Sequence, residues 1–209
     1  MDEILADLGI TLIGTWPSAL RANFDDALFN RIGVEKLKLW FKDLPVSFRF
    51  GGSEKLVVGS YYGLTSGSKI TFFANQNTNP VINILHECGH VVDNLWEDFF
   101  TNNLKGVEFR RKEAYFAGWN GFKYLGLRGD IIRAEVLKER RVAGGDAWQQ
   151  RGGTPHWEDW ADIFSNVMLE NINEENELGR QILDFVTQME THTKKATGAR
   201  DTPRASRIK

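Results

Sequence analysis

A segment near the middle of the chain combines a marked helix start with histidines at helical spacing, and it constrains the fold more than any other part of the sequence. Asn79 followed by Pro80 places a capping residue and then a proline at the first helical position. We expect this helix to run to about Asn94 or Trp96, with the segment HECGH at residues 86–90 beside its buried stripe. That stripe consists of Ile82, Leu85, Gly89, Val92 and Trp96.

His86 and His90 are four residues apart, so they project from the same face of this helix and can share one ion at about 2.0 to 2.1 Å each. Glu87, one step round the helix, can face a water on that ion. Zinc lowers the pKa of such a water towards about 7, and a neighbouring carboxylate can take its proton as the water attacks a carbonyl carbon. We therefore predict a Zn²⁺ site with the two histidines as ligands and Glu87 as general base.

A catalytic zinc usually takes three protein ligands, so the two histidines need a third from elsewhere in the chain. A histidine six residues after His90 would define the metzincin pattern, but Trp96 stands there. Glu158, at the start of a second expected helix, is our candidate. Glu113 competes with it because it is nearer to His90, but Glu113 lacks both an acid four residues on and a clean helix start. We favour Glu158.

The helix that carries Glu158 is predicted to begin at Thr154 and Pro155, which again form a cap followed by proline. Asp162 lies four residues beyond Glu158 and therefore shares its face. The carboxylate of Asp162 could accept a hydrogen bond from the free ring nitrogen of a ligand histidine and fix its tautomer. The buried stripe of this helix is expected to contain Trp157, Trp160, Ala161, Phe164 and Met168.

Two stretches, NILHECGHVVD at residues 83–93 and EDWADIF at residues 158–164, resemble the catalytic domain of the anthrax-lethal-factor-like metallopeptidases, which are gluzincins. The resemblance covers mainly residues 67–190. It implies one helix with two zinc ligands and the base, a later helix with a glutamate ligand and an acid four residues on, and an edge strand at about residues 69–74 against which an extended peptide is laid. The matching positions are His86, Glu87, His90, Glu158 and Asp162.

The sequence departs from that family in two places. The separation between His90 and Glu158 is longer than in the family, which indicates an insertion at about residues 107–150. The family usually has a tyrosine shortly before the glutamate ligand to stabilise the oxyanion, but no tyrosine occurs between Tyr124 and Glu158. The side chains that could donate a hydrogen bond in its place are His156, which we rank first, Arg151 and Tyr115.

The remaining patterns predict an α+β domain of zincin-like type. Residues 17–42 carry apolar side chains at three- and four-residue spacing, which indicates two amphipathic helices broken near Gly33. Short segments rich in β-branched and aromatic residues lie at residues 46–50, 56–62 and 69–74. We expect them to form a small, mainly antiparallel sheet that packs against the histidine helix, with additional helices around it.

The C-terminal half of the chain is predicted to hold one helix at residues 130–142 and a last helix at about residues 173–189. Residues 192–209 are polar, basic and almost free of large apolar side chains, so we expect them to be disordered. The chain is thus expected to form a single domain over residues 1–191, with N-terminal helices in residues 1–45.

Charge and cysteine content narrow the class of protein. The chain has 26 basic and 28 acidic residues and a formal net charge of -2, so we expect neither nucleic acid nor a membrane surface as a partner. Cys88 is the single cysteine, which excludes an intrachain disulfide and indicates a small buried residue. The N-terminus shows no signal-peptide pattern. We expect a cytoplasmic location, or export without a conventional signal peptide.

These patterns together predict a zinc-dependent endopeptidase, a gluzincin that hydrolyses peptide bonds in a peptide or protein substrate. One alternative is a catalytically inactive binding module that keeps the zincin fold. The other is a metal-dependent hydrolase of non-peptide amides. No oligomeric state is predicted.

Overall fold

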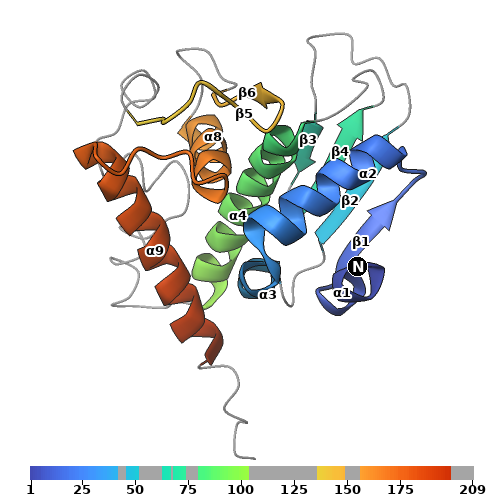
Figure 1. Cartoon of the computed structure of the whole chain (residues 1–209). Coiled ribbons are helices and arrows are strands. Elements are labelled where there is room, and N and C mark those ends of the chain that lie inside the picture. Colours follow the sequence, from blue (N-terminus) through green and yellow to red (C-terminus); the bar gives the residue numbers. More distant parts are fainter. Residues whose placement is uncertain are drawn as a thin grey trace, which may run out of the picture.

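The computed structural model describes residues 1–41, 46–51, 63–66, 68–73, 80–103, 136–148 and 156–198, in which helices pack against a small sheet (Figure 1). The fold is therefore of the predicted α+β kind. Within these ranges, no helix combines the length and the apolar character that crossing a bilayer would need.

The main sheet has four strands in the order β1-β2-β4-β3. β1 pairs with β2 and β2 pairs with β4 in parallel, whereas β3 and β4 are antiparallel. The strands are β1 (Ile10–Ile13), β2 (Val46–Gly51), β3 (Gly63–Ser66) and β4 (Lys69–Phe73). Two of the three pairings are parallel, so the prediction of a mainly antiparallel sheet is wrong.

β1 and β2 can pair in parallel because the chain between them runs through helices. Parallel neighbours need a crossover, and three helical segments lie between β1 and β2. The sequence prediction omits β1 because only four residues separate Gly9 from Gly14. It also placed residues 69–74 at the edge, which is wrong, because β4 lies between β2 and β3. The strand predicted at residues 56–62 lies outside the described residues.

The N-terminal helices are α1 (Asp2–Asp7), α2 (Ser18–Asp25), the π-helix η1 (Asp26–Ile32) and α3 (Val34–Phe41). The predicted break near Gly33 is confirmed. Gly33 has φ +84, which favours glycine, and its N–H donates to the carbonyl of Leu28, five residues back, at 2.9 Å. This bond closes the π-helical turn and lets α3 leave in a new direction.

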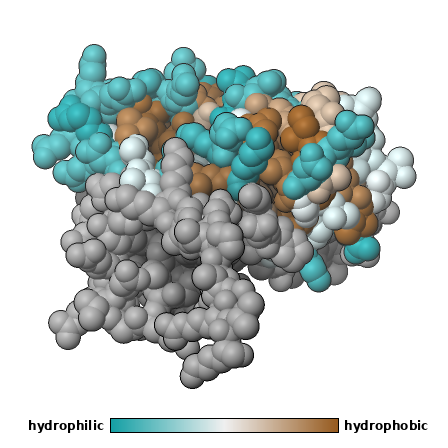
Figure 2. All heavy atoms as spheres, turned by 90° about the horizontal axis from the view of Figure 1, so that it is seen from below, coloured by the Kyte–Doolittle hydropathy of each residue, from teal (hydrophilic) through white to brown (hydrophobic). Residues whose placement is uncertain are grey.

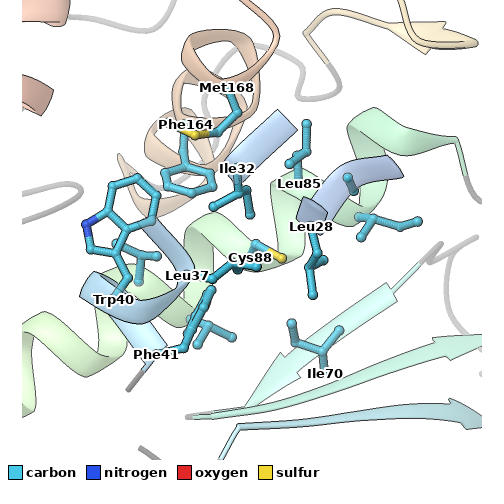
Figure 3. Packing of buried hydrophobic residues seen from close by; sticks show 14 of the residues in the cluster. Leu28, Ile32, Leu37, Trp40, Phe41, Ile70, Leu85, Cys88, Phe164 and Met168 are labelled. Atoms are coloured by element: carbon cyan, nitrogen blue, oxygen red, sulfur yellow. The ribbon is translucent and has the colours of Figure 1, made fainter. Parts of the chain in front are cut away.

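The central helix α4 (Val81–Asn103) packs against both the sheet and the N-terminal helices. It extends beyond the predicted end near Trp96. Cys88 is fully buried in it, as expected. The hydrophobic core around α4 combines apolar side chains from the N-terminal helices, the sheet, α4 and α8. Figure 3 shows Leu28, Ile32, Leu37, Trp40, Phe41, Ile70, Leu85, Cys88, Phe164 and Met168. Each buried Leu, Ile or Phe side chain contributes about 1.5 to 3 kcal/mol relative to an exposed one.

A short hairpin of β5 (Arg141–Val142) and β6 (Gly145–Asp146) stands where a helix over residues 130–142 was predicted. Residues 130–135 lie outside the described residues, and for residues 136–142 the prediction is wrong. Ala143 and Gly144 have φ +48 and +84, the pattern of a type I′ turn. Ala143 and Gly144 are therefore the two turn residues of a hairpin, and Gly145 begins β6.

Two helices complete the molecule, α8 (His156–Met168) and α9 (Glu177–Gly198). α9 lies on the far side of α4 and α8 from the sheet (Figure 1). The prediction of disorder from residue 192 is wrong as far as Gly198, because the helix continues through THTKKATG, in which lysine and alanine have high helix propensity. Residues 199–209 lie outside the described residues.

The surface shows no single continuous apolar face in the view of Figure 2, where hydrophilic side chains separate the hydrophobic ones over the described residues. The exposed large hydrophobic side chains among the described residues are Met1, Ile4 and Ile13. Scattered apolar side chains of this kind are usual on folded proteins.

Candidate metal centre

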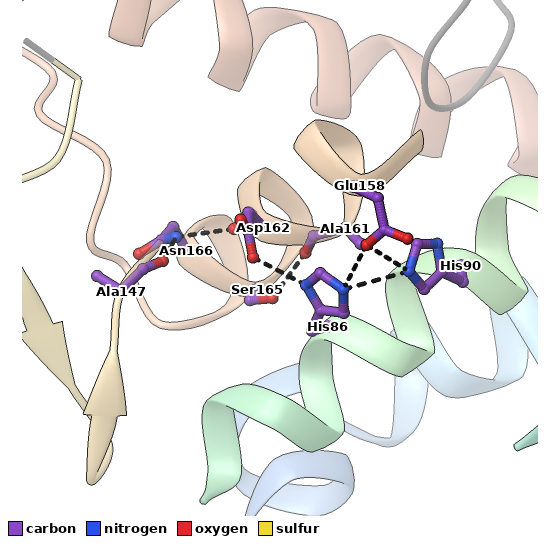
Figure 4. A network of polar contacts seen from close by, with 8 residues as sticks. All are labelled: His86, His90, Ala147, Glu158, Ala161, Asp162, Ser165 and Asn166. Atoms are coloured by element: carbon purple, nitrogen blue, oxygen red, sulfur yellow. Dashed lines mark hydrogen bonds and ion pairs between the residues drawn. The ribbon is translucent and has the colours of Figure 1, made fainter. Parts of the chain in front are cut away.

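The helix α4 presents both motif histidines on the side that faces α8 (Figure 4). The helix starts because Pro80 has no N–H to lose from the helical ladder, and its carbonyl accepts from the N–H of Ile84 at 3.3 Å. The predicted cap, Asn79, lies outside the described residues. The side chain of His86 is 4% exposed and that of His90 is 14% exposed, so the pair lies at the border between core and surface.

The helix α8 crosses α4 closely because Gly89 has no side chain. A Cβ atom at Gly89 would lie 2.9 Å from the Cα of Ala161 and 3.1 Å from the Cβ of Phe164. The indole Nε1 of Trp160 also donates a hydrogen bond to the carbonyl of Gly89 at 2.9 Å. This close approach at Gly89 brings the first turn of α8 over the histidines.

Three side chains that could bind a metal meet at this crossing. The Nε2 atoms of His86 and His90 are 3.2 Å apart, and Oε2 of Glu158 lies 3.2 Å from the first and 3.4 Å from the second. A tetrahedral ion with bonds of about 2.0 to 2.1 Å holds its ligand atoms about 3.3 to 3.4 Å apart. The three donor atoms therefore have the spacing of one face of a tetrahedral coordination shell, and this set fits Zn²⁺.

The second acid of α8, Asp162, is fully buried and holds the other side of the His86 ring. Its Oδ1 lies 2.8 Å from Nδ1 of His86. An ionised carboxylate only accepts hydrogen bonds, so Nδ1 carries the proton and donates it. Nε2 of a neutral His86 then presents its lone pair to His90 and Glu158, which is the tautomer that a metal ligand requires.

The charges of the site shift two pKa values in opposite directions. Burial disfavours the charged form of His86, but the hydrogen bond and the charge of Asp162, together with Glu158 and Glu87, outweigh it and raise the pKa to about 10. Burial would raise the pKa of Glu158, but the two imidazoles outweigh it and hold that pKa far below its usual range. Both shifts show that the cluster favours a positive charge at its centre.

Glu87 follows His86 on α4, and its side chain is mostly buried. Its charge contributes to the raised pKa of His86, so its carboxylate lies within electrostatic reach of the site. A carboxylate in that position can accept a proton from a water near the three donor atoms.

Buried amides hold α8 one turn beyond Asp162 (Figure 4). The Nδ2 group of Asn166 donates to the carbonyls of Asp162 at 2.7 Å and Ala147 at 2.5 Å, and its Oδ1 accepts from Asn171 at 2.7 Å. These bonds tie the segment that holds the β5–β6 hairpin to the helix that carries Glu158. The sequence prediction missed them; an asparagine one turn beyond Asp162 on the same face was the available signal.

The other predicted candidates are placed less fully. His156 is the first residue of α8, but its side chain is outside the described residues, so its role stays a prediction. The rival ligand Glu113 and the alternative donors Tyr115 and Arg151 also lie outside them. Of the insertion predicted at residues 107–150, the structure describes residues 136–148.

Comparisons with protein-family models, with curated proteins and with solved structures found no match for this chain.

Proposed function

We propose that this protein is a zinc-dependent endopeptidase, with His86, His90 and Glu158 as metal ligands. The observation that carries the proposal is the tetrahedral spacing of three donor atoms, 3.2, 3.2 and 3.4 Å, on two helices that also supply Glu87 and Asp162. The three donor atoms come from two helices and converge on one point, as three protein ligands of a catalytic zinc ion do. The zincin-like domain expected from the sequence belongs to the same proposal.

Each side chain has a distinct part in the proposed reaction. A zinc ion, when bound, would act as a Lewis acid towards a carbonyl oxygen and make a water acidic enough to attack at neutral pH. Glu87 takes the proton of the attacking water and passes it to the leaving amine. Asp162 holds the ring of His86 through Nδ1, which keeps Nε2 directed at the ion.

The strand β3 is the part of the sheet where we place the substrate. β3 pairs with β4 on one side, and no other strand in the described ranges pairs with it. It also packs beside α4, the helix of the histidines. An extended peptide could add to this edge through main-chain hydrogen bonds and lie along the site. This assignment replaces the predicted edge strand at residues 69–74, because β4 is internal.

The proposal is tested by measuring bound zinc with elemental analysis and hydrolysis with a peptide library. Glu87→Gln should still bind zinc but hydrolyse peptides at least about a hundredfold more slowly, since it removes the proton acceptor and leaves the ligands in place. Glu35→Gln, at an exposed position on α3, is the matched control and should hydrolyse at the wild-type rate.

The outcomes separate the alternatives. Zinc binding without any cleavage would favour the inactive binding module, and cleavage of small amides but not peptides would favour the non-peptide hydrolase. Absence of zinc binding would contradict the proposed metal site itself.

A further inference from the structure

A buried hydrogen bond joins the two helices of the metal centre at a point between the ligands. The indole Nε1 of Trp160 donates to the main-chain carbonyl of Gly89 at 2.9 Å, and the Trp160 side chain is fully buried. Gly89 directly precedes His90 on α4, and Trp160 follows Glu158 by two residues on α8. The bond therefore connects the backbone beside one ligand to the helix turn that carries another.

The bond from Trp160 to Gly89 restrains sliding and rotation of α8 along α4, which the surrounding apolar contacts oppose less. Apolar packing is non-directional, so it opposes separation of two helices more than sliding or rotation of one along the other. A hydrogen bond weakens steeply when its distance or angle changes. A carbonyl oxygen has two lone pairs, so Gly89 can accept from the indole and also take part in the helical ladder.

The indole ring of Trp160 packs against two further aromatic rings. Its centroid lies 6.0 Å from that of Phe164 on α8 and 6.2 Å from that of Phe185 on α9, the second in an edge-to-face arrangement. Ring pairs of this geometry favour one orientation of each ring. The position of Nε1 is thus set by two helices, and through it the position of α8 on α4.

We propose that Trp160 is a positioning residue of the metal centre: its indole bond to Gly89 fixes the register of α8 on α4, and so holds the Glu158 carboxylate at the third corner of the site before the ion arrives. The inference rests on the metal site proposed above and adds a residue to it. A preorganised ligand set binds more tightly because less ordering remains to be done on binding.

The test compares zinc dissociation constants, measured by competition with a chelator, for the wild type and Trp160→Phe. Phenylalanine keeps an aromatic ring and removes the donor. We expect zinc affinity to fall roughly threefold to tenfold, the effect of one buried neutral hydrogen bond. The visible absorption of the Co²⁺-loaded variant should also change, since it reports ligand geometry, which general loss of stability does not alter.

Two further variants separate positioning from structural damage. Trp40→Phe is the matched control, because Trp40 is also buried, packs on Phe164 and makes no indole hydrogen bond within the described part of the chain. It should keep the wild-type zinc affinity. In a Glu158→Ala background, Trp160→Phe should have no effect on zinc affinity, because the ligand that it positions is gone.

Each result has a definite reading. If wild-type protein binds zinc and Trp160→Phe binds it equally well, the inference is wrong and the proposed metal site stands. An equal loss of affinity in the Glu158→Ala background would also overturn it. If wild-type protein binds no zinc, the proposed function fails as well. Should Trp160→Phe not fold, replacing Trp160 with β-(3-benzothienyl)alanine removes only the N–H, and the same comparison applies.

Discussion

At the scale of single residues, three donor atoms of the site converge closely enough to share one positive charge. Nε2 of His86 faces Nε2 of His90 and an oxygen of Glu158, each at 3.2 Å, while Asp162 occupies Nδ1. Burial opposes a charge on His86, but the hydrogen bond and charge of Asp162, with Glu158 and Glu87, raise its pKa to about 10. A divalent ion satisfies all three atoms at once.

Asp162→Asn tests the electrostatic part of this arrangement. Asparagine keeps the size of the side chain and an oxygen acceptor but removes the charge that makes Nε2 of His86 a better ligand. Zinc affinity should fall about 10- to 100-fold, the usual effect of losing the acid behind a ligand histidine. A zinc titration monitored by chelator competition measures it, with the exposed Asp184→Asn on α9 as control. Equal affinities for both variants would contradict the role assigned to Asp162.

At the scale of secondary-structure elements, what could be predicted from the sequence depended on how local the signal was. α4 and α8 were expected because each follows a cap-and-proline pair and carries an apolar stripe. The parallel pairing of β1 with β2 could not be predicted, because strand order depends on contacts between distant segments. The hairpin of β5 and β6 was predicted wrongly for the same reason: the buried amide of Asn166 on α8 binds the carbonyl of Ala147, directly after β6, and sequence periodicity does not reveal that contact.

For the metal site, too, local sequence signals could be predicted and contacts between distant segments could not. The four-residue spacing of His86 and His90 predicted a shared helix face, and the four-residue spacing of Glu158 and Asp162 predicted which acids approach it. The hydrogen bond between those two helices at the crossing joins the Trp160 indole to the carbonyl of Gly89, 71 residues away. Nothing in either local sequence indicates that partner, so only the folded arrangement shows it.

Gly89→Ala tests the close crossing of α4 and α8. The new methyl group would lie 2.9 Å from the Cα of Ala161, which is backbone, so α8 must move outward. Alanine is the better helix former by about 1 kcal/mol, but overpacking of this kind costs about 1 to 3 kcal/mol. We expect a net loss of stability and weaker zinc binding, seen in thermal unfolding with and without zinc. A variant more stable than wild type with unchanged zinc affinity would show that the crossing tolerates a side chain.

At the scale of the whole molecule, α4 stands between two packed groups of elements. The sheet and the N-terminal helices contact it on one side, and α8 contacts it on the other, with α9 beyond (Figure 1). His86 on α4 and Glu158 on α8 are 72 residues apart in sequence and meet only when α8 is packed on α4. The proposed metal therefore joins α8 to α4, and an unfolded chain does not offer the same ligand set.

Zinc should for this reason stabilise the folded protein, by an amount that grows with the logarithm of its concentration above the dissociation constant. A ligand that binds only the folded state adds about 2.7 kcal/mol at a hundred times its dissociation constant. In a chain of this size that corresponds to a rise of about 5 to 10 °C in the unfolding temperature. Differential scanning calorimetry with zinc and with a chelator measures the shift. His90→Ala should lose most of it, and Mg²⁺ should not reproduce it, because Mg²⁺ prefers oxygen ligands in octahedral geometry. An unfolding temperature that zinc leaves unchanged in the wild type would mean that these three side chains form a polar cluster with no ion.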